Sequence, residues 1–337
     1  MASEKILIRM PSGLKDAIFA EPAVNCVKEN FPEAEIWAAA SVWTGDLFAG
    51  RGFFDGIIKI PTDENLREMK DAILEIRRLK FSAGLILDDS FGSVLLFYAS
   101  AVPERWGYSR EGARLMLTKT VKPAVWNGAS RHRVDHFLGL VRGLGFNCSR
   151  RSPALEVTEE EKTRATAVLI SKGLTQGQRF VILAPGSNQG AAGRWPAERF
   201  AEAASMLQAE AGVQVMLAGS DADYMAVSQI TGSMTIRPLV YLGLNDLRLY
   251  MAVIRASSLV IANDNDTLQM AAALGTPVVA VFGPSDPDMS SPLAEKSTVI
   301  YTRAPCSPCQ YTECPWDHRC MMDISSGKVF AAVKSLL

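Results

Sequence analysis

An acidic side chain near the start of the chain is the first candidate for chemistry. Residues 10–24 read MPSGLKDAIFAEPAV: an apolar run ends, Ser12 and Gly13 turn the chain, and a helical pattern starts near Asp16. A carboxylate in the first turn of a helix is favoured by the helix dipole, which would give Asp16 a purely structural role. At the end of a strand, the same carboxylate could also remove a proton from an attacking hydroxyl.

A loop of small residues follows a later apolar run. Residues 184–200 read APGSNQGAAGRWPAERF, and Pro196 suits the first turn of a helix. Small side chains let backbone N–H groups approach a phosphate, and Arg194 would add positive charge. The alternative is an ordinary surface loop that carries one exposed arginine.

A third segment, residues 258–287, reads as strand, polar turn, small-residue helix and strand. The predicted helix start near Asn265–Thr267 could hold a diphosphate through its N–H groups. However, Asp266 and Gln269 have the spacing of a capping box, with Asp266 as the N-cap. In that arrangement the carboxylate would satisfy the amides itself and repel phosphate.

Two groups of residues have spacings found at metal sites. Four cysteines in the pattern C-x2-C-x4-C-x5-C indicate either a tetrahedral zinc or iron site or buried free thiols: Cys306, Cys309, Cys314 and Cys320. His132 and His136, with Asp135 between them, would share one helix face, but no third ligand is evident. Six cysteines in a chain of this length do not indicate a disulfide scaffold.

Basic residues gather between Pro103 and Arg133, where only Glu104 and Glu111 oppose them. They are Arg105, Arg110, Arg114, Lys119, Lys122, Arg131 and Arg133. This asymmetry is compatible with a solvated surface, with a platform for an anionic acceptor, or with contact to an anionic membrane face.

The elements that must position these residues alternate between strand and helix. Predicted strands cover 5–10, 35–39, 56–60, 84–88, 180–184, 214–218, 258–262 and 277–282. Predicted helices cover 16–30, 64–79, 197–211, 246–256, 267–274 and 326–337. This alternation predicts parallel sheets covered on both faces, in two doubly wound α/β domains. The aperiodic segment 147–158 precedes a charged helix start and marks the boundary between them.

Composition and missing motifs exclude several classes of protein. The 337 residues carry a formal net charge of −1, which argues against a nucleic-acid binder. Signatures of dinucleotide-binding, P-loop, hydrolase and zinc-protease sites are missing. The beginning of the chain has no signal-peptide pattern, and the apolar stretch 270–282 is too short to span a bilayer, so we expect a cytoplasmic protein.

The three loops, in this order and spacing, resemble glycosyltransferase family 9, the ADP-heptose:lipopolysaccharide heptosyltransferases. Residues 88–118, DDSFGSVLLFYASAVPERWGYSREGARLMLT, and residues 306–324, CSPCQYTECPWDHRCMMDI, extend the likeness. It is closest to the heptosyltransferase II branch and covers roughly residues 5 to 335.

The resemblance implies a GT-B fold, in which two Rossmann-like domains face each other across a cleft. Residues 1–152 would bind the acceptor, 153–325 would bind the nucleotide-sugar donor, and 326–337 would form a helix without a predicted docking place. It also implies transfer of heptose from ADP-heptose to an anionic glycolipid, the lipopolysaccharide core, with inversion and no required cofactor. Contact with the inner membrane is a further expectation, and a nucleic-acid partner is not expected.

The resemblance places Asp16 on the catalytic aspartate and Ser187, Asp264 and Thr267 on or beside donor contacts. Together with the neighbouring polar residues, the predicted donor-binding set is Ser187, Arg194, Asp264, Asn265, Asp266, Thr267 and Gln269. The predicted acceptor-binding set is Ser12, Gly13, Lys15, Arg105, Arg110 and Arg114.

Four positions depart from the family pattern: Lys15 and Asp266 replace Gly, Gly193 replaces Lys, and Gln269 replaces His. These changes weaken the expected diphosphate site and leave open a catalytically degenerate relative that acts as a binding or assembly module. A nucleotide-sugar epimerase of the same architecture is another alternative. The run Asp264-Asn265-Asp266 also imitates the D-x-D metal motif of the other glycosyltransferase fold, although carboxylates at a helix start are usually caps.

Overall fold

A computed structural model describes residues 4–49, 52–61, 66–109, 112, 114–123 and 132–337. The chain forms two compact units, residues 1–156 and 157–337, here called the N-terminal and C-terminal units. The division falls just after the predicted boundary at 152. Residues 153–156 belong to the first unit because the buried carboxylate of Glu21 binds Arg150 and accepts a hydrogen bond from the Ala154 N–H.

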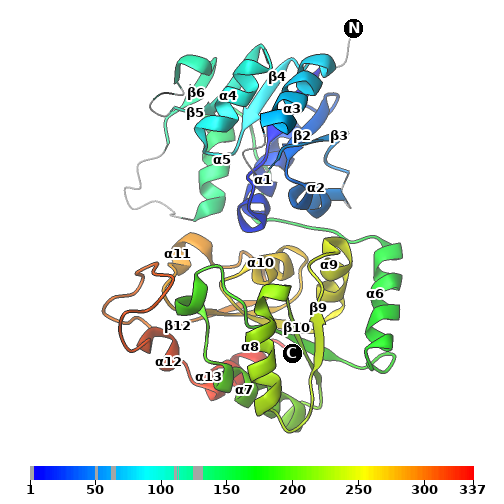
Figure 1. The fold of residues 1–337 in the computed structure, drawn as a ribbon, viewed down its shortest axis with the longest axis vertical. Helices are drawn as coiled ribbons and strands as arrows, with labels where there is room; N and C mark the ends of the chain where they lie inside the picture. The colour runs from blue at the N-terminus through cyan, green and yellow to red at the C-terminus, as the bar shows by residue number, and fades with distance from the viewer. Residues whose placement is uncertain (1–3, 50–51, 62–65, 110–111, 113, 124–131) are drawn as a thin grey trace. The chain divides into compact units, whose positions relative to one another are not determined.

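The N-terminal unit holds a six-stranded, wholly parallel sheet of order β3-β2-β1-β4-β5-β6 (Figure 1). Its elements are β1 (Lys5–Arg9), α1 (Leu14–Asn30), β2 (Glu35–Ala40), α2 (Val42–Phe48), β3 (Gly56–Lys59), α3 (Leu66–Leu79), β4 (Ala83–Ile86), α4 (Phe91–Ala99), β5 (Glu104–Tyr108), the 3-10 turn η2 (Arg114–Met116), β6 (Lys119–Val121) and α5 (Arg133–Gly143).

Helices cover both faces of this sheet. Right-handed crossovers place α1 on one face and α3 and α4 on the other, because the chain reverses its direction across the sheet between β3 and β4. Helix α1 contacts α2 and α5, whereas α3 contacts α4. The central strands are buried on both sides, as their continuous apolar runs require.

The C-terminal unit repeats this topology with the strand order β12-β11-β10-β7-β8-β9, again wholly parallel. Its elements are α6 (Glu159–Ser171), β7 (Phe180–Ala184), η3 (Gly190–Gly193), α7 (Ala197–Glu210), β8 (Gln214–Gly219), η4 (Asp221–Asp223), α8 (Tyr224–Ser233), β9 (Leu239–Leu242), α9 (Leu247–Ala256), β10 (Leu259–Asn263), α10 (Asp266–Ala273), β11 (Val278–Phe282), α11 (Pro287–Ser290), β12 (Ser297–Tyr301), α12 (Arg319–Met322) and α13 (Ser326–Lys334).

Each sheet has one point where the chain direction reverses, and ligands of open α/β sheets bind beyond the carboxyl ends of the strands there. In the N-terminal unit this switch point lies between β1 and β4, and in the C-terminal unit between β7 and β10. The three loops singled out in the sequence follow β1, β7 and β10. The fold therefore places all three at switch points.

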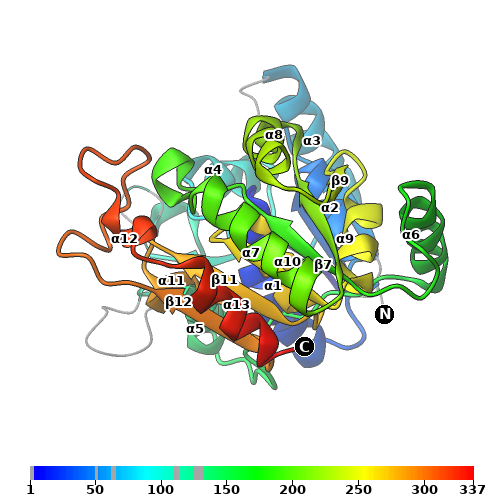
Figure 2. The ribbon, with the colours of Figure 1, turned by 90° about the horizontal axis from the view of Figure 1, so that it is seen from below.

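The predicted alternation of strand and helix is confirmed, and the eight predicted strands match observed ones to within two residues. The strands β5, β6, β9 and β12 were missed. The terminal helix, which had no predicted place, packs against α7 and β11 within the C-terminal unit (Figure 2).

Two further observations concern the whole chain. Cys26 of α1 and Cys148 form a disulfide that spans 122 residues of sequence, which the sequence analysis did not foresee. The described helices include none with the length and apolar character that crossing a membrane requires.

Candidate active site

The first-turn carboxylate of α1 is partly open to solvent and held by one arginine. Helix α1 begins after Gly13, which offers no side chain to cap it, and Asp16 lies in the first turn as predicted. The two oxygens of Asp16 accept hydrogen bonds from Nε and Nη2 of Arg133, at 3.1 and 3.3 Å. The side chain of Asp16 is 40% exposed. Since a carboxylate has about four acceptor positions, capacity remains for a hydroxyl proton.

Arg133 extends this contact into a charged network. Its Nη1 lies 3.3 Å from Asp89 Oδ2, and His136 Nε2 lies 3.0 Å from the same oxygen. Burial lowers the pKa of Arg133, but the hydrogen bonds and charges of Asp16 and Asp89 outweigh burial and raise the pKa above its ordinary value. Arg133 therefore stays cationic and fixes the Asp16 carboxylate.

The predicted histidine pair on one helix face is wrong. His132 precedes α5 as its N-cap: its Nδ1 accepts from the Val134 N–H, and its ring lies edge-on against Phe19. His136 faces Asp89 instead. The sequence pattern failed because it assumed that the helix already included residue 132.

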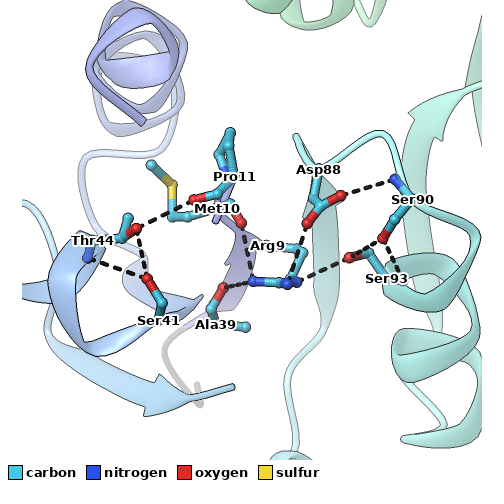
Figure 3. A network of polar contacts seen from close by, with 9 residues as sticks. All are labelled: Arg9, Met10, Pro11, Ala39, Ser41, Thr44, Asp88, Ser90 and Ser93. Atoms are coloured by element: carbon cyan, nitrogen blue, oxygen red, sulfur yellow. Dashed lines mark hydrogen bonds and ion pairs between the residues drawn. The ribbon is translucent and has the colours of Figure 1, made fainter. Parts of the chain in front are cut away.

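A buried arginine ties together the strand ends beneath the first loop (Figure 3). Arg9, the last residue of β1, donates from Nη1 to the carbonyls of Met10 and Ala39 and from Nε to Ser93 Oγ. Its Nη2 lies 3.2 Å from Asp88 Oδ2. The network joins the ends of β1, β2 and β4 to the start of α4, so it positions the loop that leads to Asp16.

The predicted acceptor-binding residues have different surroundings. Ser12 and Gly13 are exposed in the turn before α1, and Lys15 is half-buried in its first turn. Arg105 donates to the backbone carbonyls of Val102, Pro103 and Met116, so its guanidinium is used within the unit. Arg114 is exposed on η2, whereas Arg110 lies outside the described residues.

Two buried asparagines tie the second and third loops together at the other switch point. Asn263 accepts from the Trp195 N–H at 3.1 Å and donates to the carbonyls of Pro185 and Gly186. Asn265 donates to the carbonyls of Ala184 and Gly186. The sequence analysis missed Asn263, although an amide at the very end of a buried strand is a usable signal.

The predicted capping box at the third loop is wrong. The N-cap of α10 is Asn265, whose Oδ1 accepts from the Leu268 N–H at 2.9 Å, and Asp266 is the first helical residue. The Asp266 carboxylate turns to Asn188, whose Nδ2 lies 2.9 Å from Asp266 Oδ1. Gln269 donates to the Ser290 carbonyl instead of closing a box.

Most of the predicted donor-binding side chains of the third loop are internal. Asp264, Asn265, Thr267 and Gln269 are all buried. Asp264 accepts from Ser290 Oγ, and the Thr267 hydroxyl lies 2.9 Å from the hydroxyl of Tyr250. These side chains shape the loop, which leaves Asp266 as its half-exposed member.

The structure of the second loop shows why position 193 is a glycine. The same loop contains a buried hydrogen-bond donor that has no partner among the described residues. A Cβ atom on Gly193 would lie 2.1 Å from Ser187 Oγ, so a side chain there would displace Ser187. The next residue, Arg194, is half-buried, and its Nε is buried without a hydrogen-bond partner anywhere in the described chain. A buried guanidinium donor without a partner suits an anionic ligand oxygen.

The segment that carries the four cysteines, residues 306–324, supports this same loop through hydrogen bonds. The Ala192 N–H donates to the Thr312 carbonyl, His318 Nε2 lies 2.7 Å from the Ala192 carbonyl, and Trp195 Nε1 donates to the Ile324 carbonyl. The segment therefore supports the backbone on both sides of Gly193.

The four thiols of this segment are free. Burial, followed by the neighbouring thiols of Cys309, Cys306 and Cys314, raises the pKa of Cys320 to about 11. Among the residues that the structure describes, no three His, Cys, Asp or Glu side chains form a group that could hold a metal. Zinc or iron at these cysteines stays a prediction, which elemental analysis of the purified protein tests against four titratable thiols.

Comparison with known proteins identifies the family. The family model of glycosyltransferase family 9 (heptosyltransferase) matches residues 71–319. The chain belongs to glycosyltransferase family 9. A curated relative, lipopolysaccharide heptosyltransferase 2 of Escherichia coli, is 27% identical over 310 residues, which cover 88% of this chain and 87% of the relative.

Solved structures show the same fold. E. coli ADP-heptose lps heptosyltransferase II superposes with a TM-score of 0.83 at 24% identity, over 98% of each chain. A family 9 glycosyl transferase from Veillonella parvula has a TM-score of 0.89 at 22% identity, over 99% of this chain and 97% of that one. The predicted GT-B fold and family membership are confirmed, and the chain is a glycosyltransferase.

Proposed function

We propose that this glycosyltransferase moves a heptose from ADP-heptose onto the core of lipopolysaccharide or lipooligosaccharide, with inversion at the anomeric carbon. Family membership and the activity named for its E. coli relatives support the donor and the acceptor class. The observation that carries the proposal is Asp16, a half-exposed carboxylate fixed by Arg133 at the switch point of the N-terminal unit.

The proposed reaction is a single displacement. An acceptor hydroxyl attacks the anomeric carbon of the donor, the bond from that carbon to the ADP oxygen breaks, and Asp16 takes the hydroxyl proton. Arg133 orients the Asp16 carboxylate, since it donates to both oxygens. No step needs a metal.

The leaving ADP develops negative charge on its diphosphate. We assign its stabilisation to the C-terminal unit, where Arg194 Nε is buried without a partner and the first turn of α10 presents its N–H groups. Because Asn265 already caps the Leu268 N–H, the amide of Thr267 and the Arg194 side chain are the proposed contacts.

We further propose that the enzyme works in the cytoplasm, in peripheral contact with the inner membrane. The support is chemical: the proposed donor is a nucleotide sugar, whereas the proposed acceptor is an anionic glycolipid that stays in a membrane.

The test is a transfer assay with the full chain, ADP-heptose and a heptose-acceptor core glycolipid, with the product detected by mass spectrometry. We expect a mass increase of one heptose, lost in the D16N variant, and no reaction with UDP- or GDP-linked sugars. Calorimetry with ADP and UDP accompanies the assay. ADP binding without transfer to any core acceptor would overturn the proposal in favour of a degenerate binding module.

A further inference from the structure

Helix α4 of the N-terminal unit is apolar on its outer side as well as its inner side. Val94 and Phe97 are buried against the sheet, whereas Phe91, Leu95 and Tyr98 are 55%, 46% and 53% exposed. These three residues recur at intervals of four and three, so they form one stripe along the helix. A surface helix normally turns polar residues to water, and α4 has apolar residues there instead.

The neighbouring 3-10 turn extends the stripe. Turn η2 contacts α4, and its Leu115 is 95% exposed. Arg105 joins the two elements, because its guanidinium lies 5.5 Å from the centre of the Tyr98 ring while Nε donates to the Met116 carbonyl. We call Phe91, Leu95, Tyr98 and Leu115 the α4 face.

Three arginines lie beside the α4 face. Arg77 donates to the Ala99 carbonyl at the end of α4, Arg105 lies over the Tyr98 ring, and Arg114 is exposed on η2. By contrast, the described residues that line the hollow between α2 and α3 include three acids, Glu68, Asp71 and Glu75, and one base, Lys59.

We infer that the α4 face docks the enzyme on an anionic lipid membrane. Apolar side chains with cations beside them suit the boundary between acyl chains and phosphate headgroups, where tyrosine is also favoured. A second copy of the chain is a poorer occupant, since a twofold contact would bring the same cations together.

The position of the α4 face deepens the proposed function, on which this part of the inference rests. Helix α4 starts directly after Asp88 and Asp89, which pair with Arg9 and Arg133, and Arg133 holds Asp16. The stripe thus begins at the sheet edge that carries the catalytic carboxylate. A membrane held there would keep a lipid-anchored acceptor close to Asp16.

The experiment measures flotation of the full chain with vesicles of phosphatidylcholine alone or mixed with phosphatidylglycerol. We expect binding to the anionic vesicles at low salt, weakened by added salt because exposed charges are screened. The L95S/L115S variant should bind about 10- to 100-fold more weakly, since it lacks two apolar side chains that the membrane would bury. The control M225S/I236S removes two exposed apolar side chains, 66% and 55% exposed, from the C-terminal unit and should bind like the wild type.

Activity separates this inference from the proposed function. With a lipid-free core oligosaccharide, L95S/L115S should match the wild type, whereas with acceptor glycolipid in vesicles its turnover should fall. Failure of the wild type to use any core acceptor would count against the proposed function alone. Absent wild-type flotation, or equal flotation of L95S/L115S, would overturn the docking inference, as would a wild-type dimer that this variant dissociates.

Discussion

The two units share one strand order but hold their switch-point loops with different chemistry. At the N-terminal edge the contacts are ionic: Asp16 with Arg133, Arg133 with Asp89, and Arg9 with Asp88. At the C-terminal edge they are neutral amide-to-carbonyl hydrogen bonds made by the buried residues Asn263 and Asn265.

This difference fits the function that we propose for each sheet edge. Neutral, buried amides fix a backbone shape without adding charge, which suits a loop that must receive a diphosphate. A half-exposed ion pair orients a carboxylate while leaving acceptor positions open, which suits a base that must meet a hydroxyl. The predictions below test this contrast.

The largest effect is expected at the ionic edge. Replacing Asp16 by Asn keeps the size of the side chain but removes the base, so kcat should fall roughly 10²- to 10⁴-fold. The fold and ADP binding should persist, because Asp16 is partly exposed and lies outside the C-terminal unit. Turnover close to that of the wild type would assign Asp16 to helix-start electrostatics alone.

The next effect concerns stability. Arg9→Leu leaves the Asp88 carboxylate, 15% exposed, without its cation and should lower the free energy of unfolding by about 3 kcal/mol. The exposed pair of Lys119 and Glu104, in the same unit, is the control, and Lys119→Leu should cost less than about 1 kcal/mol. Urea unfolding of both variants makes the comparison. Equal losses would mean that the Arg9 network does not hold the strand ends.

At the neutral edge, Arg194 is the residue that we expect to contact the diphosphate of the donor. Arg194→Ala should weaken ADP binding about 10- to 150-fold, because a charge-assisted hydrogen bond contributes about 1.5–3 kcal/mol. Arg199→Ala, on the exposed side of α7, removes the same charge and should leave binding unchanged. Calorimetry with ADP measures both, and unaltered binding in Arg194→Ala would place the diphosphate elsewhere.

The sequence predicted the two doubly wound domains and the loops that carry the sites, because buried parallel strands read as apolar runs with a polar turn after each. It did not predict the partners of those loops. Arg9, Asp89 and Arg133 lie far apart in the sequence, and even Arg133 and Asp89, which pair with each other, are separated by 44 residues. Only the strand order brings these side chains together. The predicted start of α10 was also wrong by one residue. That shift alone changed the role of Asp266 from helix cap to half-exposed charge.

The smallest effect, and the finest test of the neutral edge, concerns Asp266. Unlike the buried carboxylate of Asp264 in the same loop, this one stands half-exposed at the first position of α10, where Asn188 donates to it and Asn265 caps the helix. Because Asn265 supplies the cap of α10, we attribute a weakening of the donor site by Asp266 to its charge. Asp266→Asn keeps an oxygen for Asn188 and removes that charge.

Repulsion between two unit charges about 4 Å apart in water-like surroundings is about 1 kcal/mol. ADP should therefore bind about fivefold more tightly to Asp266→Asn at low salt, with the gain shrinking as salt rises. Glu210→Gln makes the same change of charge at the far end of α7, roughly 20 Å from the start of that helix, and should alter ADP affinity little. If both variants shift equally, the Asp266 carboxylate points away from the diphosphate, and this departure from the family pattern no longer argues for a weakened donor site.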